Sequence, residues 1–408
     1  MRILVLTPEF PWPATSGGRV RSVAQLKVLS SLPEVTEIVI SSVREEEVSA
    51  ASIAALEGAV GKCHVMPPLF HPIHLRAHLG FVPTVVWHRL RSGLPYLAAK
   101  WVSRELAWRI TSELKRVPYD VVYIDHLGMA AYFDLVKRTS PRSRVVLEQH
   151  NIESDLFEQY RHRSHGIKRM LAGIEANKAR AFEIDVVKRA HAVVAISESD
   201  REGMRRLANV NSTVVPQVVS FARSEWSSGR TKAIYVGNLA WHPNAEGLDW
   251  FAREVWPKVR REIPDAELRV VGSGLAKGAD GKTVVPQAWR VPGIEVVGFV
   301  DDLNSVYADA AVFISPILSG SGIRIKVLEA MRSGIPLVTT EEGALGLPIT
   351  HERHALVSRG ADEFARDVVR VLRDEQLQLT LREGAYSFLE AHHSLTLAQA
   401  KMRRVLGL

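Results

Sequence analysis

A turn rich in glycine and serine, between a strand and a helix, is the part of this sequence best suited to bind a charged substrate. Residues 315–340 predict a strand, this turn, a helix and a second strand. The first turn of a helix has free N–H groups and the positive end of the helix dipole, so it attracts anions. Arg324 and Lys326 place two cations there, and Glu329 follows about one turn later. This combination suits a diphosphate attached to a sugar or ribose diol.

The same pattern also fits a turn that binds nothing. Gly-rich connections are common in α/β proteins, and Arg and Lys in a first helical turn are often only hydrated. Two basic residues at a helix start are, however, unfavourable for the helix dipole. An anionic partner would remove that penalty, so the pattern favours a binding site.

The elements that must position this turn predict two α/β domains. Runs rich in Val and Ile alternate with helical stretches in both halves of the chain. Near-continuous apolar strands are typical of parallel sheets buried on both faces. Strands are expected at 2–7, 37–43, 63–67, 121–125, 144–150, 192–197, 213–219, 233–236, 268–272, 294–300, 310–315 and 335–340. Helices are expected at 17–31, 244–263, 361–373 and 376–391, among others.

We therefore expect an α/β fold of two doubly wound, Rossmann-like domains that face each other across a cleft. The first domain would span residues 1–218 and the second 219–385. The boundary lies there because residues 217–231 are polar and lack periodicity.

The composition is that of an ordinary globular protein. The chain has 408 residues, of which 46% are apolar and 24% are charged. Cys63 is the single cysteine, which excludes an internal disulfide and a cysteine-based zinc site. The chain opens directly into a strand-like run, and no uncharged apolar run reaches membrane-spanning length. We expect a cytoplasmic protein.

The net positive charge of the chain comes from its first half. Residues 1–222 carry a net charge of +7 and residues 223–408 a net charge of zero. Residues 58–104 contain no acidic residue and mix Lys and Arg with Phe, Trp and Tyr. This mixture suits peripheral contact with an anionic membrane at its inner face, and it equally suits an ordinary surface over core helices. No nucleic-acid-binding motif accompanies it, so we expect no nucleic-acid partner.

Polar residues at the ends of two predicted strands form a second group of candidates. His150 ends one strand, and Asp125 with His126 ends another. The carboxyl ends of parallel strands meet at one edge of a sheet, where α/β proteins place their sites, so these residues are expected to line one site. Structural roles fit them as well, and Asn151 and Glu153 equally suit a helix cap.

A turn after the first strand contains Gly17 and Gly18, which allow the backbone to approach a ligand closely. Arg19 and Arg21 follow; they suit contact with an anionic acceptor, or simple exposure in a first helical turn. The turn lacks the G-x-G-x-x-G pattern of dinucleotide-binding proteins, and no Walker A motif is present.

No metal or other cofactor is expected. The chain has no spaced Asp-x-Asp motif in a suitable place, since Asp301 and Asp302 are adjacent and suit a helix cap.

With these residues in view, the chain resembles the retaining glycosyltransferases of family 4, which have the GT-B fold. The resemblance covers almost the whole length, and its strength lies in the order and spacing of several weak motifs. These motifs are residues 8–21, 148–153, 195–198, 235–239, 297–300 and 315–340.

The resemblance implies a nucleotide-sugar donor bound by the second domain and a glycan or lipid-linked acceptor bound by the first. It also implies that a last helical segment, 386–408, crosses back to the first domain. Donor contacts would come from Gly17, Gly18, Gly237, Asn238, Gly298, Phe299, Val300, Ser321, Gly322, Ile323 and Glu329. His150, Arg324 and Lys326 would act on the transferred sugar and the diphosphate, and Arg19, Arg21, Asp125, His126 and Asn151 would meet the acceptor.

The chain departs from the family's pattern at three positions. Ser321 stands where the first Glu of the E-x7-E motif is expected, while Glu329 matches the second and would bind the ribose. Asn238 and Asn244 stand where the family's diphosphate-binding Arg and Lys are expected. Our hypothesis is that Arg324 and Lys326 replace that pair, in a G-x-R-x-K-x-x-E variant found in a branch of the family.

The leading interpretation is a retaining glycosyltransferase that moves a sugar from a nucleotide-diphosphate sugar to a glycolipid or polysaccharide. One alternative is a nucleotide-sugar epimerase of the same fold, which would need no acceptor. Another is an inactive sugar-nucleotide-binding protein, for which Ser321 is the main argument.

Overall fold

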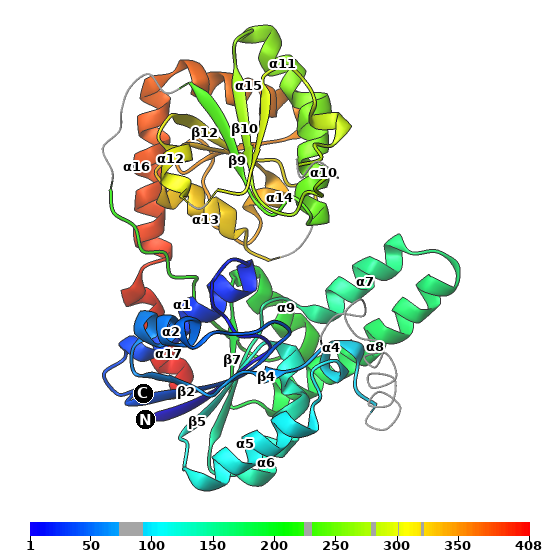
Figure 1. Ribbon diagram of the computed structural model, residues 1–408, viewed down its shortest axis with the longest axis vertical. Helices are drawn as coiled ribbons and strands as arrows, with labels where there is room; N and C mark the ends of the chain where they lie inside the picture. Colours follow the sequence, from blue (N-terminus) through cyan, green and yellow to red (C-terminus); the bar gives the residue numbers. More distant parts are fainter. Residues whose placement is uncertain (73–92, 224–230, 279–282, 301, 320–321) are drawn as a thin grey trace. The chain divides into compact units, whose positions relative to one another are not determined.

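The computed structural model describes residues 1–72, 93–223, 231–278, 283–300, 302–319 and 322–408 (Figure 1). The chain divides into two compact units. Unit 1 comprises Met1–Val218 together with Leu395–Leu408, and unit 2 comprises Val219–Ser394. Each unit has its own parallel sheet.

The sheet of unit 1 runs in the order β3-β2-β1-β5-β6-β7-β8, with β4 paired to β2, and all of its described pairs are parallel. Its strands are β1 (Arg2–Thr7), β2 (Glu37–Arg44), β3 (Cys63–Val65), β4 (Leu69–Phe70), β5 (Val121–Asp125), β6 (Arg144–Glu148), β7 (Ala192–Ala195) and β8 (Thr213–Val214). The order reverses between β1 and β5, and α/β proteins bind ligands at such a reversal.

Helices cover both faces of this sheet, as alternating side chains of β1 show. Ile3 and Val5 pack into one buried cluster, and Leu4 and Leu6 pack into another on the opposite face. The helices are α1 (Gly17–Ser31), α2 (Ala50–Val60), α4 (Tyr96–Ala99), α5 (Arg104–Arg116), α6 (Phe133–Thr139), α7 (Glu153–Arg163), α8 (Gly166–Arg189), α9 (Glu198–Ala208) and α17 (Leu395–Leu406). A short 3-10 helix, Leu127–Tyr132, follows β5.

Helix α1 occupies the residues that the sequence predicts, 17–31. Its N-cap is Ser16, whose hydroxyl accepts a hydrogen bond from the backbone N–H of Arg19 at 3.4 Å. Its buried face includes Leu26 and Leu29, which join the same core cluster as Ile3. The helix therefore stands against the sheet with its first turn beside the ends of the strands.

Helix α17 returns the end of the chain to unit 1. Met402, Val405 and Leu406 are buried in the cluster that also contains Leu29. The return begins at Leu395 rather than at the expected 386, because α16 (Glu375–His392) continues without a break through that position and belongs to unit 2.

The sheet of unit 2 runs in the order β11-β10-β9-β12-β13-β14, and its described pairs are all parallel. Its strands are β9 (Lys232–Val236), β10 (Glu267–Val271), β11 (Ile294–Gly298), β12 (Ala310–Ser315), β13 (Leu337–Thr340) and β14 (Leu356–Ser358). Its helices are α10 (His242–Trp250), α11 (Trp256–Glu262), α12 (Leu303–Tyr307), α13 (Ile325–Arg332), α14 (Glu341–Ala344), α15 (Gly360–Arg373) and α16.

The helix expected at 244–263 is divided. A π-helical turn, Phe251–Val255, separates α10 from α11. Pro257 lies just inside α11, has no N–H, and cannot bond the carbonyl four residues earlier, so a regular α-helix cannot pass through this point.

The strand expected at 213–219 is much shorter in the structure. β8 is an edge strand of two residues, Thr213–Val214, and Pro216 follows it closely. Proline lacks the N–H that a ladder needs, which explains the early end. Among the described helices, none combines the length and apolar character needed to span a bilayer.

Candidate active site

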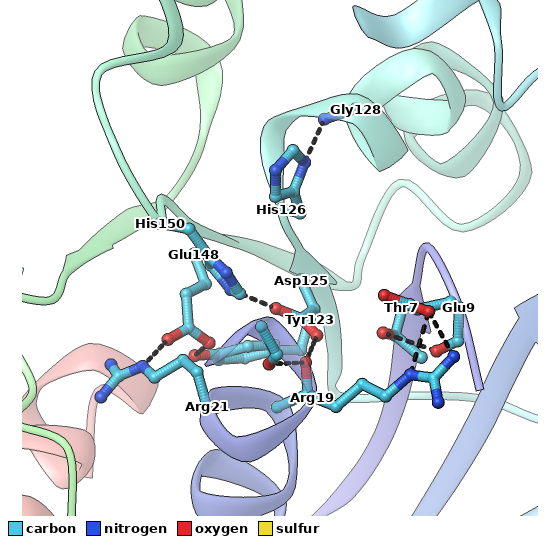
Figure 2. Close-up of polar contacts among 12 residues, drawn as sticks. Thr7, Glu9, Arg19, Arg21, Tyr123, Asp125, His126, Gly128, Glu148 and His150 are labelled. Carbon is cyan, nitrogen blue, oxygen red and sulfur yellow. Dashed lines mark hydrogen bonds and ion pairs between the residues drawn. The ribbon is translucent and has the colours of Figure 1, made fainter. Parts of the chain in front are cut away.

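The carboxyl ends of β5 and β6 bring together three of the residues expected at the site in the first half of the chain, and they add Glu148, which was not among the expected site residues. Asp125 and Glu148 end these neighbouring strands and are direct partners in the parallel register. The backbone N–H of His126 donates to the carbonyl of Glu148 at 3.1 Å, and His150 follows two residues after β6. Figure 2 shows these side chains gathered beside the first turns of α1.

His150 and Asp125 form the central pair of this edge. The Nε2 atom of His150 lies 2.7 Å from Oδ1 of Asp125, and the Ser22 hydroxyl donates to Oδ2 at 2.5 Å. Asp125 is buried, and the His150 side chain keeps 12% of its exposure. Burial alone would lower the pKa of His150, but the Asp125 carboxylate outweighs it and the pKa is raised. The pair therefore favours a protonated, oriented imidazole that is still accessible.

Glu148 is held by a second, fully internal set of contacts. Nε of Arg21 donates to Oε1 of Glu148 at 2.7 Å, and the Tyr123 hydroxyl donates to Oε2 at 2.7 Å. Arg21 also donates to the carbonyl of Val215 at 2.8 Å and is 2% exposed. The expectation that Arg21 meets an acceptor is therefore corrected: its charge balances a buried carboxylate, because neither ion could be buried alone.

His126 and Glu153 lie beside the central pair. The His126 ring meets that of His150 edge-on, with centroids 5.3 Å apart. Its Nδ1 accepts from the Gly128 N–H at 3.1 Å, which leaves Nε2 3.3 Å from a Glu153 carboxylate oxygen. Burial would raise the pKa of Glu153, but the hydrogen bond and charge of His126 lower it further than burial raises it. Lys100 also interacts electrostatically with Glu153.

The remaining expected residues of unit 1 are more exposed. Gly17 and Gly18 form the exposed first turn of α1, and a Cβ atom on Gly18 would meet nothing within 4 Å. Arg19 forms an ion pair with Glu9 at 2.7 Å. The N-cap of α7 is Ile152, so Asn151 and Glu153 do not fill the cap role that their types suggest.

A cation could in principle approach Asp125, Glu148 and His150, since one ligand atom from each lies within 4.8 Å of the others. The chain's own donors already occupy these groups, however. Arg21 and Tyr123 take both oxygens of Glu148, and Ser22 and His150 take those of Asp125. A guanidinium in the same cluster also disfavours a second positive charge.

Glu183 on α8 anchors the chain that follows His150. Its carboxylate accepts from the amide of Gln149, the N–H of Glu153, and both the N–H and the hydroxyl of Ser154, at 2.6 to 3.0 Å. It thus supplies the N-terminal cap of α7 that no neighbouring side chain provides. No local pattern in the sequence predicts this contact, because the partners are about thirty residues apart.

Burial raises the pKa of Glu183 to about 7, although the donors of Ser154 and Glu153 favour the ionised form. Between the ordinary value of 4.5 and about 7, the folded state therefore binds more protons than the unfolded state. Stability owed to this group falls as pH rises through that window. We expect the Tm of wild type, relative to that of Glu183→Gln, to decrease from pH 5 to pH 8 in thermal unfolding. A difference that grows with pH would show that the ionised form is favoured instead.

In unit 2, three loops rich in glycine meet at the carboxyl edge of the sheet. Gly237 follows β9, Gly272 follows β10 and Gly298 ends β11. The N–H of Gly237 donates to the carbonyl of Val271 at 3.0 Å. The N–H of Gly272 donates to the carbonyl of Gly298 at 2.8 Å. A Cβ atom on Gly272 would collide with the carbonyl of Gly237, so only glycine allows this approach.

Lys326, in the first turn of α13, reaches this edge. Its amine donates to the Tyr235 hydroxyl at 2.7 Å and to Oδ1 of Asn244 at 2.6 Å, and it lies over the Tyr235 ring. A Cβ atom on Gly237 would come within 3.0 Å of the amine, so this glycine makes room for it. Burial and the charge of Arg324 lower the pKa of Lys326 to about 7. A cation in such a place is stabilised by an added anion.

The Asn residues that stand in place of the expected cations have a definite role here. The Asn244 amide donates to the carbonyl of Asn238 at 2.7 Å, and Oδ1 of Asn238 accepts from the N–H of Ala240 at 2.9 Å. The loop after β9 is therefore closed by these two side chains, and Asn244 presents its oxygen to Lys326.

Arg324 differs from Lys326 in its environment. It is the N-cap residue of α13, is 4% exposed, and donates to the carbonyl of Ser319 at 3.4 Å. The Ser319 hydroxyl in turn donates to Glu246 at 2.7 Å. Arg324 is therefore a buried cation that contacts the loop before α13, and its expected contact with a diphosphate stays a prediction.

The other expected donor residues are distributed around this edge. Glu329 is partly exposed and pairs with Arg332 at 2.8 Å, and Phe299 is 67% exposed beside the partly buried Val300. Gly322, with φ +76°, and Ile323 directly precede Arg324. Ser321 lies outside the described residues. Helix α13 starts at Ile325, directly after Arg324.

Comparison with known proteins adds to this geometry. Residues 230–374 match the family model described as Glycosyl transferases group 1. This part of the chain is therefore similar to the glycosyltransferases of group 1. This match covers unit 2 from β9 through α15, the part of the chain that contains Gly237, Lys326 and Glu329.

Similarity to other proteins also extends beyond the residues that the family model matches. A 44.6 kDa protein of the cps region of Klebsiella pneumoniae is 22% identical over 96% of both chains. A phosphatidyl-myo-inositol mannosyltransferase of Propionibacterium freudenreichii is 25% identical over 40% of this chain and 44% of its own length. The crystal structure of HepE from Anabaena in complex with UDP and glucose is 14% identical, with a TM-score of 0.67, and covers 100% of this chain and 99% of its own. The expected α/β fold of two parallel-sheet domains, that of the GT-B glycosyltransferases, is confirmed.

Proposed function

We propose that this protein is a retaining glycosyltransferase of family 4, of the G-x-R-x-K-x-x-E branch, that moves a hexose from a nucleotide-diphosphate sugar to a glycolipid or polysaccharide. The observation that carries the proposal is the Lys326 amine, held beside a glycine-lined sheet edge with a pKa lowered to about 7. Such an amine is prepared to receive a diphosphate. The UDP and glucose bound by HepE support a nucleotide-sugar donor.

In this proposal the donor lies along the carboxyl edge of unit 2. Lys326 neutralises the diphosphate, and the N–H groups of Gly322 and Ile323 bind its oxygens. Glu329 binds the ribose hydroxyls after leaving its exposed pair with Arg332, a contact worth little in water. The backbone of Gly298 to Val300 holds the base.

The transfer step breaks the bond between the anomeric carbon and the diphosphate oxygen and forms a bond from that carbon to an acceptor oxygen on the same face. The proton of the acceptor hydroxyl passes to the departing diphosphate oxygen. His150 orients and stabilises the transferred sugar, and Asp125 sets the ring's orientation and charge. Lys326 stabilises the charge that develops on the leaving group.

The chain thus supplies the positive charge itself, and we propose transfer without a metal. Full activity in the presence of a chelator is the expected result, and a strict manganese requirement would contradict it.

The acceptor is proposed to be a lipid-linked glycan, reached by a protein peripheral to the inner membrane face. The name of the Propionibacterium relative, a phosphatidylinositol mannosyltransferase, supports a lipid acceptor. Much of the basic and aromatic segment 58–104 that first suggested membrane contact lies outside the described residues, which omit 73–92.

A metal-free binding panel of UDP, GDP, ADP and dTDP with their common sugars tests the donor assignment. Calorimetry is expected to show one nucleotide bound more tightly than the others, with the affinity reduced in Glu329→Ala. The matched control is Glu254→Ala, an exposed Glu on a helix of the same unit. No binding by any nucleotide would contradict the proposal. Turnover of the donor without an acceptor would indicate the epimerase, and binding without turnover the inactive protein.

The variant Gly18→Ala distinguishes an effect on stability from an effect on substrate binding. A Cβ atom there would meet no atom within 4 Å, so Gly18→Ala is expected to keep or slightly raise the Tm. If substrate approaches this backbone, the same variant should raise KM by about tenfold, because a methyl group would occupy that space. Gly58→Ala, on α2 with equally open surroundings, is the control. Unchanged KM in Gly18→Ala would remove this turn from the site.

A further inference from the structure

Helix α8 carries an apolar stripe that no part of the described chain covers. Ile167, Met170, Leu171 and Ile174 are 70%, 57%, 55% and 47% exposed. Their spacing of three and four residues places them on one face of the helix. Large apolar side chains that gather on a surface in this way mark an interaction site more often than scattered ones do.

The stripe is not the face by which α8 packs on unit 1. Ala172, Glu175, Ala176 and Ala179 are buried on the opposite side of the helix. Figure 1 shows α7 and α8 as a pair of helices extending away from the sheet of unit 1. The folding of unit 1 therefore explains the buried face of α8 but gives no reason for the exposed stripe.

Positive charge surrounds this stripe. Residues 159–180 contain six Lys and Arg and a single acid, Glu175, for a net charge of +5. Glu175 is buried, where it accepts from the N–H of Tyr96, whereas Lys168, Arg169 and Arg180 are exposed. Lys168, Arg169 and Arg180 therefore present positive charge at the tip of the hairpin, while Arg161 pairs with the partly exposed Glu158 just before this segment.

Two of these cations share a hollow with the stripe. An open hollow between α7 and α8 is lined by Arg161 and Arg169 together with Met170 and Ile174. Gly173 leaves room for the Arg161 side chain, because a Cβ atom on Gly173 would lie 3.1 Å from Cδ of Arg161. Guanidinium groups beside apolar side chains match a phosphate attached to an acyl chain.

We propose that the α7–α8 hairpin, residues 153–189, docks on an anionic phospholipid membrane. The stripe of Ile167, Met170, Leu171 and Ile174 enters the acyl boundary, and the surrounding Lys and Arg contact lipid phosphates. A second copy of the chain is a poorer occupant, because pairing two such hairpins would bring two basic rims together. The proposal does not depend on the donor chemistry of unit 2.

Co-sedimentation with vesicles tests this docking directly. Wild-type protein is expected to bind vesicles of phosphatidylglycerol and phosphatidylcholine, and to bind pure phosphatidylcholine far less. Two variants should each reduce partitioning into the vesicles by about tenfold or more. One replaces all four residues of the stripe with Ser, and the other replaces Lys168, Arg169 and Arg180 with Glu. Added salt should weaken the wild-type binding, since exposed charges are screened.

Matched variants elsewhere in unit 1 serve as controls. Trp108→Ser removes a 70% exposed aromatic side chain from α5, and Arg205→Glu with Arg206→Glu reverses two charges on α9. Both should retain vesicle binding, and circular dichroism should show every variant folded. Equal loss in the controls, or no binding of wild type to anionic vesicles, would overturn the proposal. So would a dimer in sedimentation analysis that the stripe variant dissociates while vesicle binding is unchanged.

Discussion

Replacing Lys326 with Met is expected to lower kcat/KM for the nucleotide-sugar donor by about 10²–10³-fold. The amine is the charge that we assign to the departing diphosphate, and its contacts with Tyr235 and Asn244 fix its position before substrate binds. Met keeps most of the aliphatic length, so the packing of α13 should survive. Steady-state kinetics with the donor found in the binding panel would measure the effect.

Lys326→Met should leave the fold intact and should make the free energy of unfolding depend less on pH. The pKa of Lys326 in the folded state, about 7, lies below its ordinary value of 10.5, so between these values the unfolded state binds more protons. The free energy of unfolding of wild type should therefore rise with pH through this window, relative to that of the variant. Urea unfolding at several pH values would measure it.

Lys258→Met is the matched control for Lys326. This lysine is also in unit 2, where it forms an exposed ion pair with Asp362 at 2.6 Å. Its removal should change neither donor kinetics nor stability appreciably. Similar kinetics for wild type and Lys326→Met would mean that the diphosphate is neutralised elsewhere.

Replacing His150 with Ala is expected to reduce kcat by about 10²-fold or more while leaving the affinity for the nucleotide unchanged. The ring stands at the carboxyl edge of the sheet in unit 1, whereas the nucleotide contacts are assigned to unit 2. A loss confined to kcat would place His150 at the transferred sugar. His64→Ala, which removes a 67% exposed histidine of the same unit, is the control.

The pH profile distinguishes a catalytic His150 from a merely structural one. Asp125 raises the pKa of His150, so stability and activity owed to the protonated ring are present below the ordinary histidine value and are lost as pH rises through the raised one. Removing the negative charge in Asp125→Asn should shift the alkaline fall in kcat to lower pH. A profile that does not move would contradict a role for the protonated ring.

The sequence was sufficient to predict most elements of the fold. The parallel strands read as apolar runs, and α1 has both an N-cap Ser and an apolar face, so its range was predicted fully. The edge of β5 and β6 was also predictable, because strand ends converge in a parallel sheet. Breaks such as the π-helical turn before α11 depend on how one proline is accommodated, which periodicity does not report.

Side-chain partners across the fold were not predictable in the same way. Arg21 reads as a first-turn cation, yet it is buried against Glu148, which is 127 residues away. Lys326 and Arg324 read alike as two cations at a helix start, but one reaches the glycine-lined edge and the other braces a loop. Glu183, which caps α7 from α8, has no signal at all in its own segment.

Calorimetric titration of UDP at about pH 8, in two buffers that differ in ionisation enthalpy, tests whether Lys326 binds the diphosphate. We expect binding to be accompanied by proton uptake, because a diphosphate would raise the lowered pKa of Lys326 and draw a proton onto its amine. Lys326→Met should bind more weakly and without that uptake. Wild-type binding with no proton uptake, or equal binding and equal uptake in the variant, would contradict the assignment of Lys326 to the diphosphate.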